Sequence, residues 1–196
     1  YPVVTPLAVD SGHPFPFLAN NTINAIVRIF QVQPDGTKDY KIAILPIPSV
    51  LDRIIEVPSS SNKVHRFVYL EDVISYYAIQ FFQGYGIEES MIFRLTRDAD
   101  LEIDEEDAKD LLTEVEASLR RRRRGDAVRL EVVGAGSPEL LRTVLASVEL
   151  EEKDVYHIDG HLDCRMYFDF SNYPGYDNLR YKPFEPKIPS DLIGFE

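Results

Sequence analysis

The chain contains 196 residues, of which 33 are acidic and 21 are basic, so its formal net charge at pH 7 is −12. Its hydrophobic content of 44% excludes a disordered chain, and no apolar run approaches the roughly 20 residues of a membrane-spanning helix. The acidity disfavours a role in binding nucleic acid, because contacts to phosphates depend on clustered Lys and Arg.

The first part of the chain predicts an irregular lead-in followed by a β-hairpin. Residues 1–20 are rich in proline and aromatic residues, so we expect them to be ordered but irregular. Apolar and polar residues then alternate as they do in strands, and Pro34-Asp35-Gly36 supplies a turn between the two runs. Residues 22–45 therefore predict an antiparallel hairpin.

Two short strands and a helix are expected next. The strands lie near residues 53–57 and 65–69, on either side of a Ser-rich loop. Apolar residues at helical spacing predict a helix at about 71–82, which Gly84 and Gly86 end.

The second half of the chain predicts strands that alternate with helices. One parity is shared by Met91, Phe93, Leu95, Ala99, Leu101 and Ile103, which indicates one long strand or a bent pair of strands. Asp104 caps a helix that Gly125 closes. The remaining elements are a strand over 128–132, a helix that starts at Ser137-Pro138 and a short strand over 155–158.

This order of elements predicts an α+β fold. We expect a mixed, largely antiparallel sheet with about three helices packed on it. The expected organisation is a lead-in over 1–20, a single domain over 21–172 and an extended proline-rich tail over 173–196 that leads to further domains. A single cysteine, Cys164, cannot form an internal disulfide, and the first residues lack the pattern of a signal peptide. We therefore expect a cytoplasmic protein.

Five consecutive arginines, Arg120–Arg124, form the strongest local charge pattern. One interpretation is a patch that binds phosphate groups. The other is a solvated helix end, because cations at the C-terminus of a helix and acids at its N-terminus both complement the helix dipole. Residues 98–116 hold ten acids and one lysine, which compensate much of the arginine charge. The second interpretation is favoured, and it leaves one or two of the arginines able to reach an anion.

The sequence predicts neither an assembled catalytic site nor a metal site. His157 and His161 lie near several aspartates, but Asp159-Gly160 interrupts the segment and no Cys or Glu pair completes a zinc site. The acids of 98–107 lack the central Gly and terminal Glu of a calcium loop. Gly134-Ala135-Gly136 lacks the third glycine and the lysine of the nucleotide-binding motifs.

Five blocks of sequence, in this order along the chain, carry a resemblance to a known family. They are TPLAVDSGHPFPFLANNTIN (Thr5–Asn24), FRLTRDADLEIDEEDAKDLL (Phe93–Leu112), RRRRRGDAVRLEV (Arg120–Val132), DVYHIDGHLD (Asp154–Asp163) and LRYKPFEPKIP (Leu179–Pro189). They are similar to the middle, or head, domain of bacterial polyphosphate kinases of the type with phospholipase-D-like catalytic halves. Two positions depart from the family, which more often has a different residue at His161 and commonly a basic residue at His157.

The resemblance implies a longer enzyme that reversibly transfers the terminal phosphate of ATP to inorganic polyphosphate through a phosphorylated histidine. The phosphohistidine, Mg²⁺ and the ATP or ADP contacts would belong to other domains. We therefore expect no catalytic residue and no cofactor in this chain, which should be inactive alone. The resemblance further implies a structural role in dimerisation, within a homo-oligomer whose other domains are the partners of this one. A cytoplasmic location is expected, and peripheral membrane association stays open.

Aromatic and apolar residues at both ends of the chain are candidates for contacts with other domains or subunits. Segments rich in proline and aromatic residues, without a regular period, usually need a surface to cover. The alternative is that they cover the sheet of their own domain. The candidates are Phe15, Phe17 and Leu18 in the lead-in and Tyr181 and Phe184 in the tail.

Three arginines are weak candidates for contact with polyphosphate. Arg94 and Arg97 occupy positions that a strand would not place on its core face, and Arg124 ends the arginine run. The alternative for Arg94 and Arg97 is an ion pair with nearby acids. Two competing functions also follow from the sequence: an independent polyanion-binding or regulatory module that uses the helix end at Arg120–Arg124, and a self-contained enzyme.

Overall fold

The computed structural model of the chain describes residues 3–10, 12–60, 64–98 and 125–187. The chain divides into two compact units, Tyr1–Asp163 and Cys164–Glu196. The division falls before residue 173, where the tail is predicted to begin.

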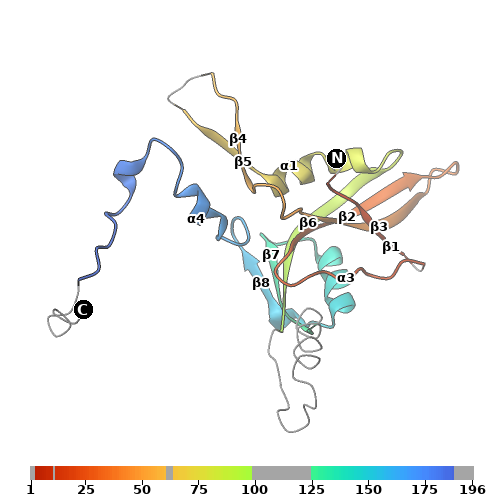
Figure 1. Ribbon diagram of the computed structural model, residues 1–196. Helices are drawn as coiled ribbons and strands as arrows, with labels where there is room; N and C mark the ends of the chain where they lie inside the picture. The colour runs from red at the N-terminus through yellow and green to blue at the C-terminus, as the bar shows by residue number, and fades with distance from the viewer. Residues whose placement is uncertain (1–2, 11, 61–63, 99–124, 188–196) are drawn as a thin grey trace, which may run out of the picture. The chain divides into compact units, whose positions relative to one another are not determined.

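A six-stranded sheet is the centre of the first unit (Figure 1). Its strand order is β1-β3-β2-β6-β7-β8, and all neighbours are antiparallel except β7 and β8. The strands are β1 (Leu7–Val9), β2 (Ile23–Val32), β3 (Lys38–Pro46), β6 (Gly86–Arg97), β7 (Ala127–Val133) and β8 (Val155–Ile158). With three α-helices among the described residues, this mixed, mostly antiparallel sheet confirms the predicted α+β fold.

A second, two-stranded sheet and a short helix lie between β3 and β6 in the sequence. Strands β4 (Ile54–Val57) and β5 (Arg66–Tyr69) form an antiparallel hairpin, and helix α1 (Leu70–Tyr76) follows directly. Tyr77 ends α1, and a 3₁₀-helix, η1 (Ala78–Phe81), continues the chain. The single helix predicted over 71–82 is therefore two shorter helices of different winding.

The two faces of the large sheet carry two separate apolar clusters, because side chains alternate along each strand. The first face is covered by helix α3 (Pro138–Val148) and by part of the lead-in. The members of this first cluster include Leu18, Ile26, Ile44, Met91, Phe93, Leu95, Leu130, Val132, Leu140 and Val144. The second face is covered by α1 and η1. The members of this second cluster include Ile23, Ala25, Val27, Ala43, Leu45, Leu70, Ile74, Ala78 and Leu162.

Helix α3 joins the two parallel strands β7 and β8. The Ser137 side chain accepts a hydrogen bond from the Leu140 amide at 3.2 Å, and Pro138 occupies the first turn. Glu149, with a φ of 58°, ends the helix in the left-handed conformation. A 3₁₀-helix, η2 (Glu152–Asp154), then leads into β8. The helix start predicted at Ser137 is confirmed.

The second unit contains helix α4 (Met166–Phe170) and the 3₁₀-helix η3 (Asp177–Leu179). Arg180 holds this unit together locally. Its guanidinium donates to the Ser171 and Tyr173 carbonyls at 3.0 and 3.2 Å and to the Asp177 carboxylate at 2.8 Å. Residues 180–187 form neither helix nor strand, and they are exposed.

The elements predicted from alternation agree with the structure. The hairpin over 22–45 is β2 and β3, and the strand predicted from Met91 to Ile103 overlaps β6 from Met91 to Arg97. In the lead-in, residues 7–9 are not irregular, because they form β1 against β3. The predicted helix that starts at Asp104, together with the end of the strand predicted before it, lies outside the described residues.

Candidate functional site

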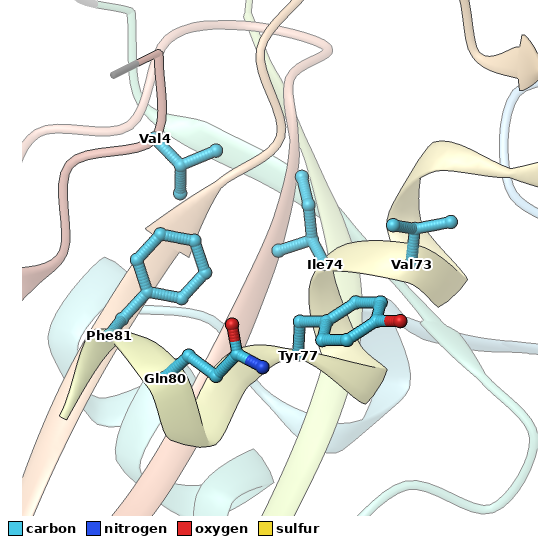
Figure 2. A pocket seen from close by; sticks show the side chains of 6 residues that line it. All are labelled: Val4, Val73, Ile74, Tyr77, Gln80 and Phe81. Atoms are coloured by element: carbon cyan, nitrogen blue, oxygen red, sulfur yellow. The ribbon is translucent and has the colours of Figure 1, made fainter. Parts of the chain in front are cut away.

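An apolar pocket of about 300 Å³ lies beside α1 and η1. Figure 2 shows Val4, from the lead-in, across the pocket from side chains of the two helices. The six residues that line the pocket are Val4, Val73, Ile74, Tyr77, Gln80 and Phe81. Two of these side chains carry polar groups, the Gln80 amide and the Tyr77 hydroxyl. None of the six is charged. The pocket is suited to an apolar side chain and not to a phosphate-bearing substrate.

Three exposed apolar residues, Val3, Tyr76 and Ile79, are sequence neighbours of residues that line the pocket. Tyr76, the last residue of α1, is 79% exposed, and Ile79, within η1, is 43% exposed. The rings of Tyr76 and Tyr77 meet edge to face, with centroids 5.0 Å apart. We call the pocket together with Val3, Tyr76 and Ile79 the α1–η1 patch. Exposed apolar side chains next to residues that line an apolar pocket are typical of sites of contact with other protein surfaces.

A buried ion pair holds the first turn of α1 in place. Glu71, in the first turn of α1, is 1% exposed, and both its carboxylate oxygens accept from the Arg53 guanidinium. The same guanidinium donates to the Leu162 and Asp163 carbonyls at 2.8 and 2.9 Å. The pair therefore ties α1 to the segment that follows β8. The sequence gives no local signal for this pair, because the two residues are 18 positions apart.

His161 packs against the same ion pair. Its ring stacks on Tyr69, with a centroid distance of 3.4 Å, and its Nδ1 atom lies 3.6 Å from the Glu71 carboxylate. The other histidine of the predicted pair, His157, directs Nδ1 to the Gly134 carbonyl at 3.0 Å. Among the described residues no group of three or more His, Cys, Asp or Glu side chains could hold a metal ion.

The structure does not bring Arg94 and Arg97 together. Arg94 pairs with Glu131 of β7 at 3.1 Å and donates to the Asn21 side chain at 2.9 Å. Arg97 follows an irregularity in the β6–β7 register and packs against the lead-in. The ion pair considered for Arg94 as an alternative is present.

Arg97 links the lead-in to the residues just before β7. Its guanidinium donates to the Leu18 and Gly125 carbonyls at 2.8 and 2.9 Å and lies 4.3 Å from the centre of the Phe17 ring. Burial lowers the pKa of the Arg97 guanidinium below its ordinary value, and the nearby Asp126 carboxylate opposes this shift. Its contacts are with carbonyls and a ring, and the expected alternative of a surface ion pair does not describe them.

The predicted contact residues differ in where their side chains lie. Leu18 is 3% exposed within the first cluster, and Phe15 packs against it, so both cover the sheet of their own domain. Phe17 is exposed above Arg97. In the second unit Tyr181 is fully exposed, and Phe184 is nearly so. Arg124 and the rest of the arginine run lie outside the described residues.

No helix in the described part of the chain is both long and apolar enough to cross a membrane.

Comparison with known proteins gives consistent results along the whole chain. A family model described as the polyphosphate kinase middle domain matches residues 1–170. The polyphosphate kinase of Halalkalibacterium halodurans is 41% identical over 197 residues, which cover 99% of this chain and 28% of that protein. The polyphosphate kinase of Pseudomonas syringae pv. tomato is 37% identical, over 100% of this chain and 26% of that protein. This chain therefore spans little more than a quarter of the length of these relatives.

A solved structure agrees on the fold. The crystal structure of polyphosphate kinase from Porphyromonas gingivalis matches 97% of this chain and 26% of its own chain, with a TM-score of 0.67 at 21% identity. The family model covers residues 1–170, and the alignment with a relative that is 41% identical covers 99% of the chain. This chain therefore belongs to the polyphosphate kinase family, in which it corresponds to the middle domain.

Proposed function

We propose that the chain is a structural and assembly domain of a polyphosphate kinase. The enzyme would reversibly transfer the terminal phosphate of ATP to inorganic polyphosphate through a phosphohistidine outside this chain. Mg²⁺ and ATP or ADP would bind to other domains. Family membership and the names of the relatives support this proposal. The relatives are also much longer than the part that this chain matches.

The α1–η1 patch is the observation that carries the proposal. Phosphoryl transfer needs concentrated positive charge or a metal ion around the phosphate. The pocket at the centre of the patch is lined by apolar and neutral side chains. Its chemistry fits contact with protein, so the role of this domain is to hold other parts of the enzyme in position.

The occupant that we propose for the patch is a neighbouring domain of the same polypeptide. A middle domain has neighbours on both sides, and relatives such as that of Bacillus cereus are more than three times the length of this chain, which covers 28% of them. Val3 and Val4, at the start of the region that the family model matches, belong to the patch. The domain that precedes the middle domain would therefore enter the structure beside this surface.

The wider setting follows from the same proposal. The complete enzyme would be a homo-oligomer in the cytoplasm, with any membrane association peripheral, and it would bind polyphosphate through its other domains. The exposed aromatic rings of Phe17, Tyr181 and Phe184 are additional contact sites under this proposal.

A matched pair of double variants of the full-length enzyme tests this function. Tyr76→Ser with Ile79→Ser removes two apolar side chains of the patch, which are 79% and 43% exposed. Val50→Ser with Leu51→Ser removes two others of nearly the same exposure, 80% and 42%, from the loop after β3. We expect the patch variant to lower the thermal midpoint or dissociate the enzyme in light scattering, with about a tenfold loss of activity.

The loop variant should leave the thermal midpoint and the oligomeric state unchanged and the activity within twofold of the wild-type enzyme. Equal behaviour of the two double variants would contradict an assembly role for the patch.

A further inference from the structure

The second face of the sheet changes from apolar to charged where it crosses β6, β7 and β8. In the strand register Arg94 of β6 lies opposite Glu131 of β7, and Glu131 lies opposite Tyr156 of β8. Arg129, two residues before Glu131, projects from the same face. We call these four side chains the β6–β8 row.

Two guanidinium groups share one carboxylate in this row. Arg94 Nη1 lies 3.1 Å from one oxygen of Glu131, and Arg129 Nη2 lies 2.9 Å from the other. The four side chains of the row therefore carry a net charge of +1 among themselves, in a chain whose net charge is −12. Such a charge attracts an anion more strongly where the surrounding surface leaves it partly buried.

Both arginines also have unused hydrogen-bonding capacity. Among the described residues, the Nε atoms of Arg94 and Arg129 are buried and have no hydrogen-bond partner. Buried polar atoms are nearly always paired in native structures, so two such donors in one row need an explanation. An oxyanion bound at the exposed Arg129 side chain could supply an acceptor for its Nε after a small rotation of that side chain.

Arg129 is the accessible member of the row. Its side chain is 41% exposed, whereas that of Arg94 is 15% exposed. The Arg129 guanidinium lies 4.0 Å above the centre of the Tyr156 ring, which holds its planar group in place. A guanidinium that is fixed on a ring loses little freedom when it binds a ligand.

We propose that the β6–β8 row is a binding site for a phosphate-type oxyanion. Arg129 contacts the anion directly, Tyr156 supports its guanidinium, and Arg94 adds charge while it holds Glu131. Phosphate and carboxylate oxygens both match the planar fork of donors on a guanidinium group, and phosphate is favoured here because it carries more negative charge. The site lies outside the α1–η1 patch and does not depend on the assembly function.

The test titrates the protein, labelled with ¹⁵N at arginine Nε, with orthophosphate and with tripolyphosphate at low ionic strength. We expect the Nε–H signals of Arg94 and Arg129 to shift together and to saturate. Tripolyphosphate should bind more tightly, because it carries more charge on one molecule. Arg129→Gln should weaken the binding at this site about tenfold, since a charge-assisted contact is lost.

Two further variants separate a site from a general charge effect. Arg142→Gln removes the same charge from an exposed position on α3, and it should change the affinity less than twofold. Tyr156→Leu keeps an apolar support but removes the ring face, and we expect a loss of about threefold. Signals that do not shift, or equal losses for Arg129→Gln and Arg142→Gln, would overturn the proposal. Such a result would leave the patch variants and the assembly function unaffected.

Discussion

The two faces of the central sheet differ in how completely this chain covers them. On the first face, α3 and the lead-in bury the apolar side chains of β6 and β7, including Phe93 and Leu130 at 0% exposure. On the second face, the short helices α1 and η1 pack over β2 and β3 and leave an open pocket. Beyond them, the same face carries the charged row over β6 to β8. The first face serves stability, and the second face holds the surfaces that we propose for contacts.

The largest effect is expected in the first cluster. Phe93→Ala removes a ring that is 0% exposed and leaves a cavity between the sheet and α3. It should lower the free energy of unfolding by about 4 kcal/mol. Urea denaturation followed by circular dichroism measures this loss.

The control is Tyr76→Ala on the second face, where the side chain is largely exposed. It should change the free energy of unfolding of this domain by less than about 0.5 kcal/mol. Similar losses for the two variants would show that the faces do not differ in the way described.

A slightly smaller effect should come from the buried ion pair at the first turn of α1. Arg53→Met leaves the buried Glu71 carboxylate without its partner, and we expect a loss of about 3 kcal/mol in the free energy of unfolding. Replacing both residues by Met should recover much of that loss, because no unpaired charge stays buried. Chemical denaturation of the single and double variants provides the measurement.

Lys153→Met is the matched control, because its ion pair with Glu151 is exposed. A loss below about 1 kcal/mol is expected there. If Arg53→Met were as mild as Lys153→Met, the ion pair would not be what holds α1 on the second face.

The smallest effect concerns the exposed turn between β2 and β3, which belongs to neither face. The Thr37 hydroxyl and then the Thr37 amide donate to the Asp35 carboxylate, and they hold its pKa below the ordinary value of 3.8. Because the folded pKa is the lower one, the stabilisation is present above the unfolded pKa and is lost as the pH falls through the folded pKa. Thr37→Val should raise the pKa of Asp35 toward 3.8 without reaching it, since the amide still donates.

Carbon-detected NMR titration of the Asp35 carboxyl measures this change. Asp10, whose pKa is also lowered, by the Gly12 amide first and His13 next, is the internal reference and should not move. An unchanged pKa of Asp35 would mean that the hydroxyl contact does not form in solution.

Local patterns in the sequence predict the strands well because each face of a strand repeats every second residue. The alternation in β2, β3 and β6 indicated that these segments are strands, although both faces of β2 are buried from Ile23 to Val27, and Ser137-Pro138 indicated the start of α3. The three residues of β1 are too few for a period to show. They become a strand because β3 offers them an edge with which to pair.

The sites depend on contacts between distant parts of the chain, which no local pattern indicates. Val4 meets α1 and η1 only in the folded unit, so the pocket could not be found from the spacing of its residues. Arg94 was a candidate anion contact from its position in a strand. Its neighbours Arg129 and Tyr156 were not, because the pairing of β6, β7 and β8 brings them together.

The large sheet ends in its shortest strands. β1 has three residues and β8 has four, whereas the inner strands β2 and β6 have ten and twelve. An edge this short offers few free amide and carbonyl groups along which a second molecule could add a strand. The long, apolar strand β2 pairs with β3 on one side and with β6 on the other along most of its length. This arrangement guards the folded domain against fibre-like aggregation at high concentration.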